Sequence, residues 1–535
     1  MHHNIKSITI VGGGSSGWMT AAAIVKQLPG IKVTLVESPN IATIGVGEST
    51  IGHINEYLHC IGLKDEDWMK HCNATYKTSI KFINFKENPT DKPHTFHYPF
   101  GRYDFTDKPR GLMDWFIYKA RNPDTPCENF AEFYHDMVMM SEANKLTKNE
   151  DSRIRGFDFR SDTAYHMDAT MFGIYLRDNI CKPAGLTHIL ATVTGASQAE
   201  DGSISVIHTE EHRDLTADLF VDCTGFRSLL LEQTLGEEFV SFHDTLLNDR
   251  AIATVMPYID RDQEMECVTS CTAIEAGWVW NIPLWNRIGT GYVYSSKFAT
   301  ESAAEEQFRN HLKSNVMVCP DSDRAGAVEF KHIKIKHGVH KHAWSHNVVG
   351  IGLANGFIEP LESTGLMLAH EGIMKLVQAL QMRDGHVTKY EIDSFNFAFY
   401  EQIMGFKDFI SLHYGLSMRN DTPYWKHVSE KITYSQAMID FVPSVVNAYA
   451  ELAYKHYRSH VYGTDMSGIV YIAAGMGYNP VTRTKVDFLD IGYNENPGYE
   501  KEVYNKWLEH KQEVTRVIEQ LPNHREFLEK TIYNE

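Results

Sequence analysis

A cluster of polar side chains stands in an otherwise apolar part of the chain, at Glu359-Pro360-Leu361-Glu362-Ser363-Thr364-Gly365. Ser363 or Thr364 is a suitable N-cap for the apolar helix predicted after it, and Gly365 lets another group approach the backbone closely. Free N–H groups at such a helix start bind anions, and the helix dipole strengthens the attraction. The segment therefore predicts either an anion site or an ordinary capped helix start with Glu362 as a first-turn acid.

Two lysines lie four residues apart in the largely apolar segment Tyr76–Phe85, at Lys77 and Lys81. This spacing puts both on one face of the segment, whether it is helical or extended. Lysines beside apolar side chains commonly reach out to water from the edge of a structure. A desolvated lysine that faces a carboxylate would instead be a reactive amine or a strong hydrogen-bond donor.

Two tryptophans alternate in Gly277-Trp278-Val279-Trp280-Asn281-Ile282-Pro283. If this segment is a strand, Trp278 and Trp280 lie on the same face. They form either a simple packing wall or a wall that keeps water and substrate away from a reactive cofactor.

The elements that must position these residues begin with a glycine-rich turn near the N-terminus. An apolar strand at Ile8–Val11 runs into Gly12-Gly13-Gly14-Ser15-Ser16-Gly17, and a helix is predicted over residues 18–28. A second strand follows over residues 31–36. Strand, turn, helix and strand in this order indicate a dinucleotide-binding unit.

Each glycine of this fingerprint has a physical task. Gly12 permits the tight turn, Gly14 lets a pyrophosphate approach the backbone, and Gly17 lets helix and strand pack closely. Glu37 ends the second strand twenty residues past Gly17, where a ribose hydroxyl needs an acceptor. The sequence therefore predicts nucleotide binding here.

Further strands return to this unit from distant parts of the chain. Candidates are His188–Val193, Ala217–Gly225 and Asn347–Ala354, while residues 252–296 predict a mostly antiparallel sheet. From Gly365 onward the pattern is mainly helical. Residues 86–110 show no steady periodicity and predict a surface excursion.

These patterns predict an α/β fold of two domains. The first is a Rossmann-like, three-layer ββα domain in discontinuous pieces with an inserted sheet, and the second is a mainly helical substrate domain. The predicted boundaries are 1–85 plus 155–365 for the first domain and 86–154 plus 366–535 for the second.

Composition limits the class of protein. The 535 residues are 43% hydrophobic and 22% charged, as in ordinary globular proteins. The net charge of −18 without a basic stretch argues against a nucleic-acid partner. No apolar run approaches the ~18 residues that span a bilayer, and the start does not resemble a signal peptide. The eight cysteines lack a metal-ligand pattern, so we expect reduced thiols, no metal site and a soluble, cytoplasmic protein.

Taken together, the segments above resemble the flavin-dependent halogenases of the tryptophan-halogenase type. The likeness covers most of the chain in family order. The matching segments are the N-terminal glycine fingerprint, Tyr76–Phe82, Tyr165-His166-Met167-Asp168-Ala169, Gly277–Pro283, Glu359–Gly365 and Asp421-Thr422-Pro423-Tyr424-Trp425. The tryptophan motif is the specific one, because related flavin monooxygenases generally lack it.

The resemblance implies a reaction in which reduced FAD, supplied by a separate flavin reductase, and O2 oxidise a halide to hypohalous acid. Trp278 and Trp280 would block direct hydroxylation of the organic substrate. The oxidant would diffuse to Lys77, which forms a haloamine or donates a hydrogen bond to it. Glu362 would tune the lysine, assist proton transfer and stabilise the cationic arene. The resemblance thus favours the functional interpretation of Lys77 and Glu362.

The resemblance also implies a set of binding residues. The halide would lie at the backbone of Thr364 and Gly365. The cofactor would contact Gly12, Gly13, Gly14, Ser15, Ser16, Gly17, Glu37, Gly47, Glu48, Ser49, Val193, Gly225, Gly352 and Leu366. The substrate would contact Ser363 and Phe100, together with either His97 or Tyr98.

One departure from the family concerns the substrate. Halogenases of free tryptophan hold its amino and carboxyl groups with a Tyr-Tyr pair and a following Glu. Here the matching segment, His460–Gly468, lacks that pair with its acid in register. We therefore expect an open site for indoles, phenols or other electron-rich aromatics.

Two other functions fit parts of the sequence. A flavin-dependent aromatic monooxygenase would oxygenate its substrate without needing halide. A non-catalytic, flavin-fold binding protein would not oxidise halide. The sequence leaves the preferred halide and the oligomeric state open, and a homo-oligomer is compatible with it.

Overall fold

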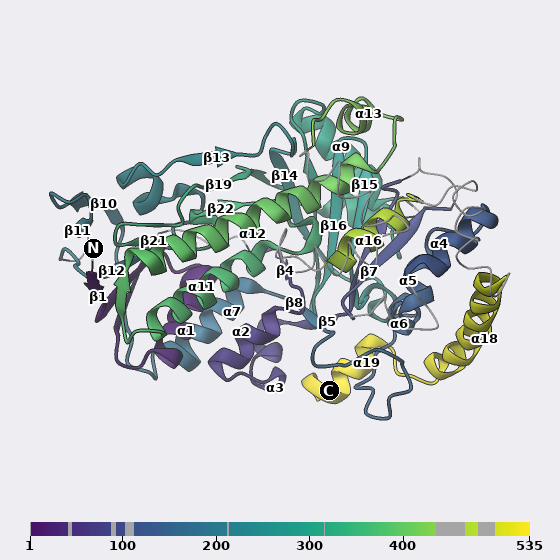
Figure 1. Cartoon of the computed structure of the whole chain (residues 1–535), viewed down its shortest axis with the longest axis horizontal. Coiled ribbons are helices and arrows are strands. Elements are labelled where there is room, and N and C mark those ends of the chain that lie inside the picture. Colours follow the sequence, from purple (N-terminus) through teal and green to yellow (C-terminus); the bar gives the residue numbers. More distant parts are fainter. Residues whose placement is uncertain are drawn as a thin grey trace.

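The computed structural model describes residues 2–40, 45–86, 92–101, 112–210, 213–314, 316–434, 466–479 and 498–534. Two large β-sheets lie along the long axis of the molecule, and helices cover them (Figure 1). The N-terminus is at one end, beside the first sheet, and the C-terminal helices lie below the second (Figure 1).

The first sheet has six strands in the order β20-β21-β12-β2-β3-β9. Its strands are β2 (Ser7–Val11), β3 (Lys32–Glu37), β9 (Thr187–Leu190), β12 (Leu219–Asp222), β20 (Trp344–Ser345) and β21 (Val348–Gly350). All neighbours are parallel except β20, which pairs antiparallel with β21. Their apolar runs are buried, as in parallel sheets covered on both faces. The sheet draws on distant stretches of the chain, which confirms the predicted discontinuous assembly.

Helix α1 (Ser15–Gln27) follows β2 directly and begins three residues earlier than predicted, because Gly14 is its N-cap. Gly12 has φ +112°, and a Cβ there would lie 2.3 Å from the Cys223 carbonyl oxygen. A side chain at Gly17 would collide with the backbone of Gly12 at 1.9 Å. The glycines therefore allow the strand, turn and helix to pack without space for side chains.

The second sheet has seven strands in the order β18-β14-β17-β16-β15-β6-β7. They are β6 (Ser79–Ile83), β7 (Thr95–Pro99), β14 (Arg250–Met256), β15 (Val268–Ile274), β16 (Gly277–Pro283), β17 (Ile288–Tyr294) and β18 (Lys331–Lys334). Only the β6–β15 pair is parallel. The antiparallel sheet predicted for residues 252–296 is confirmed.

Strand β7 differs from the prediction for its part of the chain. Residues 86–110 were expected to be a surface excursion, but Thr95–Pro99 pair with β6 along its whole length. The predicted domain boundary after residue 85 therefore passes through this sheet. The polar–apolar alternation of this strand is only five residues long, Thr95-Phe96-His97-Tyr98-Pro99. It lies between Pro- and Asp-rich stretches, so the sequence shows no clear period there.

A three-stranded sheet, in the order β4-β8-β5, lies against the second sheet and carries the predicted reactive lysine. Its strands are β4 (Glu48–Ser49), β5 (Thr75–Lys77) and β8 (Ala164–Met167). Lys77 ends β5, whereas Lys81 lies in β6 of the seven-stranded sheet. The expectation that the two lysines share one face is wrong, because Thr78 separates two strands that belong to different sheets.

The C-terminal part is mainly helical, as predicted. Its helices are α11 (Gly365–Gln381), α12 (Lys389–Gly415), α13 (Pro423–Glu430), α16 (Met466–Gly475), α18 (Tyr499–Glu519) and α19 (His524–Leu528). The long helix α12 runs from the region of the first sheet towards the second and brings residues near its end to the site described below (Figure 1).

Further strands and α-helices complete the described chain. They are β1 (His2–Asn4), β10 (Val193–Gln198), β11 (Ile204–Thr209), β13 (Phe239–Ser241), β19 (Gly338–His340), β22 (Gly356–Phe357), β23 (His386–Thr388), α2 (Ile54–Ile61), α3 (Asp65–Trp68), α4 (Leu112–Arg121), α5 (Asn129–Tyr134), α6 (Asp136–Glu142), α7 (Ala169–Leu176), α8 (Arg261–Glu264), α9 (Glu301–Leu312) and α10 (Ser322–Ala327). None of the helices in the described ranges has the length and apolar character that crossing a bilayer requires.

Candidate active site

Lys77 is fully buried where the three-stranded sheet, the seven-stranded sheet and the start of α11 meet. Its ammonium group donates to Ser49 Oγ at 2.9 Å, to the Thr50 carbonyl oxygen at 3.1 Å and to Ser363 Oγ at 2.6 Å. The lysine is therefore a desolvated, fully bonded amine and not a solvated edge residue.

The electrostatic surroundings of Lys77 set its protonation. Burial lowers the pKa of Lys77 to about 7, while the nearby Cys271 and Glu362 act in the opposite direction. The amine also lies 4.8 Å from the centre of the Phe100 ring. At neutral pH both the ammonium and the nucleophilic amine are accessible, as a group that exchanges protons during catalysis requires.

Cys271, on β15, is a buried neighbour of Lys77 and Glu362. Its thiol donates to the Leu361 carbonyl oxygen at 3.6 Å. Burial raises the pKa of Cys271, and Glu362 adds to this effect. The sulfur is therefore held in its protonated form.

Glu362 lies one residue before Ser363, which bonds to Lys77, and its side chain is 3% exposed. Its Oε1 lies 2.7 Å from His413 Nε2, and the other ring nitrogen of His413 donates to the Phe409 carbonyl oxygen at 3.1 Å. Oε2 of Glu362 is buried and has no hydrogen-bond partner. One carboxyl oxygen is thus anchored to an imidazole, while the other is available to a bound molecule.

The protonation of Glu362 follows from burial and from its neighbours. Desolvation raises the pKa of Glu362, and the hydrogen bond and charge of His413, together with Lys77, act against that rise. A carboxyl group whose pKa is raised holds a proton more readily and can both accept and return one. The imidazole of His413 is therefore the partner that tunes this acid.

The predicted anion site is the start of α11, where Thr364 is the N-cap and Gly365 the first helical residue. Ser363 adopts a left-handed conformation, with φ 58°, to make the turn into the helix. The hydroxyl Oγ1 of Thr364 is buried and has no partner. The first N–H groups of an α-helix lack intrahelical acceptors, so this position offers several unused donors to an anion.

A third carboxyl group lies close to the same helix start. A Cβ at Gly365 would lie 3.6 Å from Oε2 of Glu48, so this glycine leaves room between helix and carboxyl. Burial raises the pKa of Glu48 to about 7. Near neutral pH this group is therefore partly uncharged, which reduces its repulsion of an anion.

The two tryptophans of β16 form the predicted wall. Their ring centres lie 6.3 Å apart in an edge-to-face arrangement, on the face of the sheet that carries Thr269 and Cys271. The Trp278 indole donates to Glu359 Oε2 at 2.8 Å, and this buried oxygen also accepts from Asn248 and Tyr414 at 2.8 Å each. Glu359 thereby fixes the position of Trp278.

The glycine fingerprint has the shape that a dinucleotide needs. A Cβ added at Gly14 would meet no atom within 4 Å, which leaves the backbone open to a pyrophosphate. At Gly13 the same atom would lie 1.5 Å from Glu37 Oε2, so the carboxyl group lies directly over the turn. His188 holds the other carboxyl oxygen of Glu37 at 2.7 Å. The residues present therefore fit FAD.

Several other predicted cofactor residues surround this turn. A Cβ at Gly352 would lie 2.3 Å from Ser16 Oγ, and Leu366 is buried in the first turn of α11. Ser15 Oγ donates to the Ala169 carbonyl oxygen at 3.1 Å. Gly225 follows β12, and Val193 begins β10.

Gly47 and Ser49 flank Glu48 at β4. Gly47 has φ +129°, and its position packs near Leu284. The hydroxyl of Ser49 bonds to Lys77, so this predicted cofactor residue also contributes to the site of the lysine.

The predicted substrate residues separate into two faces of β7. Tyr98 packs between Phe409 and Tyr471, and Phe100 lies against Lys77. His97 points the other way, where it bonds to Ser79 Oγ at 2.8 Å and to Glu142 at 2.6 Å. The geometry therefore brings Phe100 to the lysine, places Tyr98 among the aromatic side chains of α12 and α16, and leaves His97 apart.

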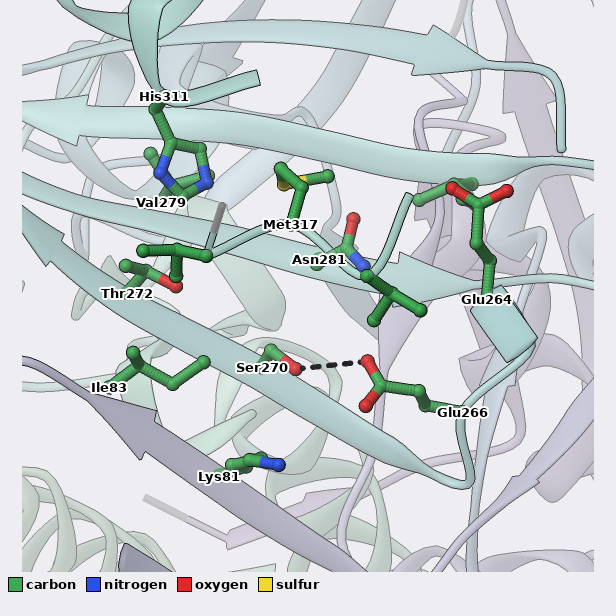
Figure 2. A pocket seen from close by; sticks show the side chains of 13 residues that line it. Lys81, Ile83, Glu264, Glu266, Ser270, Thr272, Val279, Asn281, His311 and Met317 are labelled. Atoms are coloured by element: carbon green, nitrogen blue, oxygen red, sulfur yellow. Dashed lines mark hydrogen bonds between the residues drawn. The ribbon is translucent and has the colours of Figure 1, made fainter. Parts of the chain in front are cut away.

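A separate cavity of about 80 Å³ lies on the other face of the seven-stranded sheet (Figure 2). Its sheet-borne lining comes from Lys81 and Ile83 of β6, Ser270 and Thr272 of β15 and Val279 and Asn281 of β16. Successive side chains of a strand point to opposite faces, so these alternate with the residues near Lys77 and with the tryptophans. The sheet thus separates this cavity from the candidate active site.

Potential metal ligands do not gather at the lysine site in the described ranges. Those ranges hold one group with metal-ligand spacing, Glu301, Glu305 and His332. Two of its members are exposed, and His332 is already paired with Glu305 at 2.9 Å. Cys267 and Cys271 are buried free thiols.

With this geometry in place, comparisons with known proteins place the chain in a class. The family described as "Tryptophan halogenase" matches residues 7–486. The chain belongs to the tryptophan-halogenase family. Its members are flavin-dependent halogenases, so the chain is an enzyme, and membership implies FAD and a halide ion.

Individual relatives cover most of this halogenase. The tryptophan 6-halogenase SttH of Streptomyces toxytricini is 35% identical over 443 residues, which are 79% of this chain and 80% of the relative. The structure called VirX1 is 43% identical, with a TM-score of 0.89 over 99% of this chain and all of that one. Tar14, a tryptophan C-6 flavin-dependent halogenase (chlorinase) from taromycin biosynthesis, has a TM-score of 0.81 and 33% identity over 98% of this chain and 99% of that one.

Four contributors to the halogenase site carried no role in the sequence analysis. They are His166, Thr269, Glu359 and His413. Two of them lie in segments that resemble the family, at Tyr165–Ala169 and Glu359–Gly365, and that position was the available signal. His413 lies inside the long helix α12, where no local pattern marks it.

Proposed function

We propose that the chain is a reduced-FAD-dependent halogenase that installs a halogen on an electron-rich aromatic compound such as an indole or a phenol. The observation that carries this proposal is the coulombic interaction of the fully buried Lys77 with the buried Glu362, which lies three residues before the start of α11. An amine, an acid and an anion-binding helix start in one place are the parts that halogen transfer needs.

FAD would be held by the glycine fingerprint, by Glu37 and by residues near Gly225 and Gly352. Supplied in reduced form by a separate flavin reductase, it would give two electrons to O2, and the oxygen thus reduced to the level of peroxide would take two electrons from the halide to give hypohalous acid and water. Thr364 and Gly365 would hold the halide through backbone N–H groups. Trp278 and Trp280 would keep the organic substrate away from the cofactor.

Lys77 would direct the oxidant to the substrate. It either takes up the halogen as a haloamine or donates a hydrogen bond that polarises hypohalous acid. Glu362 would accept the proton that the arene loses and stabilise the cationic ring before that loss. Positioned acid–base groups of this kind contribute about 10²–10⁴-fold in rate.

The substrate would lie against Phe100, Tyr98 and Ser363. Relatives of this chain are tryptophan halogenases by name, but the segment expected to hold a free amino acid lacks the Tyr-Tyr pair and its acid. Residues 460–465 of that segment lie outside the described residues. The sequence supports substituted indoles and phenols over free tryptophan.

The test is a substrate panel incubated with FAD, a flavin reductase, NADH and chloride, bromide or iodide in turn, read by mass spectrometry. We expect halogenated product from the wild type and none from Lys77→Ala, because the oxidant then has no amine to direct it. Hypohalous acid, measured with a diffusible scavenger, should form at the wild-type rate in the variant. Wild-type halogenation of an indole by Lys77→Ala would contradict the role of the lysine.

Two outcomes of the same panel would favour other functions. An oxygenated product that needs no halide would indicate a flavin-dependent monooxygenase. A protein that binds no FAD, or binds it without oxidising any halide, would be a non-catalytic binding protein.

A further inference from the structure

A chain of hydrogen bonds leads away from Lys77 through Ser49. Ser49 Oγ lies 2.9 Å from the Lys77 amine and 2.6 Å from Thr269 Oγ1. Thr269 Oγ1 lies 2.8 Å from Nε2 of His166. All four side chains are buried, so the chain is closed to water.

The far end of this chain fixes the direction of every hydrogen in it. Thr75 Oγ1 lies 2.6 Å from the Pro283 carbonyl oxygen, which can only accept, so the hydroxyl donates there. His166 Nδ1, 3.3 Å from Thr75 Oγ1, must then donate to it. Burial lowers the pKa of His166 well below its usual value, so the ring is neutral and its Nε2 accepts.

The donors and acceptors of the remaining hydrogen bonds, back to Lys77, follow in the same way. Thr269 donates to His166 Nε2, and Ser49 donates to Thr269. Ser363 donates to Ser49 at 3.1 Å, so its oxygen can accept from Lys77. All three protons of the Lys77 ammonium are therefore engaged, with Ser49, Ser363 and the Thr50 carbonyl as acceptors.

We infer that Ser49, Thr269 and His166 form a proton relay that deprotonates Lys77. The inference rests on the proposed function. An N–H bond of Lys77 breaks as an O–H bond forms at Ser49, whose own proton moves to Thr269, and the proton of Thr269 bonds to His166 Nε2. Lys77 becomes a neutral amine and His166 an imidazolium, with no change in total charge.

The neutral amine is what haloamine formation consumes. Its lone pair attacks the halogen of hypohalous acid, and the hydroxide that leaves takes a proton from the nitrogen to give water and the haloamine. Transfer of the halogen to the arene leaves the nitrogen one proton short of the amine. Glu362 takes the proton that the arene loses and returns it to the nitrogen, which restores the amine. Reversal of the relay restores the ammonium and neutral His166.

Electrostatics keeps the relayed proton from staying on the imidazole. Burial is the main cause that lowers the pKa of His166, and the neighbouring His524 lowers it further. Because the proton moves within the network, the two cations never coexist. The titratable groups around the relay on neighbouring elements are Glu48 of β4, Cys271 of β15, Glu362 before α11 and His524 of α19. The transfer is uphill and is drawn forward as hypohalous acid consumes the amine.

The variant that tests the relay is Thr269→Val, which removes the central hydroxyl with little change in shape. The matched control is Thr272→Val on the same strand, because Thr272 is equally buried and points to the opposite face of the sheet. Single-turnover halogenation of an accepted indole is measured at pH 6 and pH 9, together with hypohalous acid formation.

We expect Thr269→Val to lose about 10²-fold in rate at pH 6. The loss should shrink towards pH 9, where Lys77 is already neutral. Hypohalous acid formation and the Thr272→Val variant should be unaffected at both pH values. A loss of the same size at both pH values, or no loss, would overturn the relay as long as the wild type halogenates. A wild type that does not halogenate would instead refute the proposed function.

A second measurement does not depend on turnover. In protein labelled with ¹⁵N-histidine, the relay requires the Nδ1–H tautomer of His166, assigned by its loss in His166→Asn. This resonance should exchange slowly with solvent, because the ring is fully buried. An Nε2–H tautomer would reverse the direction of the chain and overturn the relay.

Discussion

Glu362 and His413 share one proton more than a carboxylate and a neutral imidazole would hold. His413 Nδ1 donates to a carbonyl oxygen, so its Nε2 is either a bare acceptor or the second N–H of an imidazolium. A contact of 2.7 Å to the carboxyl then requires a proton between the two groups. At the scale of single residues, Glu362 and His413 therefore hold a shared proton close to Lys77.

Replacing the imidazole of His413 tests the role of this shared proton. In His413→Phe the ring contacts with Phe82 and Phe409 persist, but Glu362 loses the neighbour that lowers its pKa. The pKa of Glu362 rises further, so a smaller fraction of the group is ionised and able to take the proton of the arene. We expect turnover to fall about 10²-fold at pH 7 and to recover partly at higher pH, measured as a pH–rate profile.

The control for this variant is His370→Phe, a buried histidine in α11 that packs near Tyr57. It should leave the pH–rate profile unchanged. An unchanged profile in His413→Phe would show that Glu362 does not depend on the imidazole.

At the scale of elements, the start of α11 combines donors and a carboxyl group at one anion site. The N–H groups of Thr364 and Gly365 attract a halide, whereas Glu48 repels it once ionised. Because burial raises the pKa of Glu48 to about 7, the repulsion is switched on as pH rises through that value. Halide binding should therefore weaken on the alkaline side.

Glu48→Gln isolates this effect. The wild type should show a halide KM that rises several-fold between pH 6 and pH 8.5, because the ionised carboxyl repels the anion. The variant should show a smaller rise, since only the loss of charge on Lys77 remains. Steady-state kinetics at several bromide concentrations measure both, and FAD affinity of the variant is determined alongside. Equal rises in the two proteins would place Glu48 too far from the halide to matter.

Local sequence patterns predict the helices and strands of this chain better than the contacts between them. The fingerprint, the antiparallel sheet and the helix after Gly365 follow from local patterns, since turn chemistry and periodicity act over a few residues. Strand β7 escaped because its five residues are too few to show a period among prolines and charges. The prediction that Lys77 and Lys81 share a face was wrong for a related reason. The break between β5 and β6 at Thr78 has no signal in the local pattern.

The contacts of the site itself needed the fold. His166 and Thr269 lie about 100 residues apart and touch because β8 and β15 belong to sheets that pack together. His413 reaches Glu362 only because α12 runs the length of the molecule (Figure 1). No local spacing encodes such contacts, so motifs single out Lys77 and Glu362 as candidates, while the residues that bond to them cannot be predicted from the sequence.

At the scale of the whole molecule, the first sheet carries the predicted cofactor turn and the three-stranded sheet carries Lys77. Under the proposed function, FAD would arrive already reduced and would have to enter and leave during each cycle. We therefore expect weak FAD binding, with purified protein carrying well below one FAD per chain by absorbance. An unrelated flavin reductase should support turnover in the same assay. Stoichiometric, tightly held FAD after purification would contradict this exchange.

The thiol of Cys271 has a bearing on how long each molecule survives. A thiol close to Lys77 would be exposed to oxidation by hypohalous acid, and thiolates react far faster than thiols. Burial and the nearby carboxyl keep this sulfur protonated. Under the proposed function, the dry surroundings that would make Lys77 reactive would also protect this thiol from hypohalous acid.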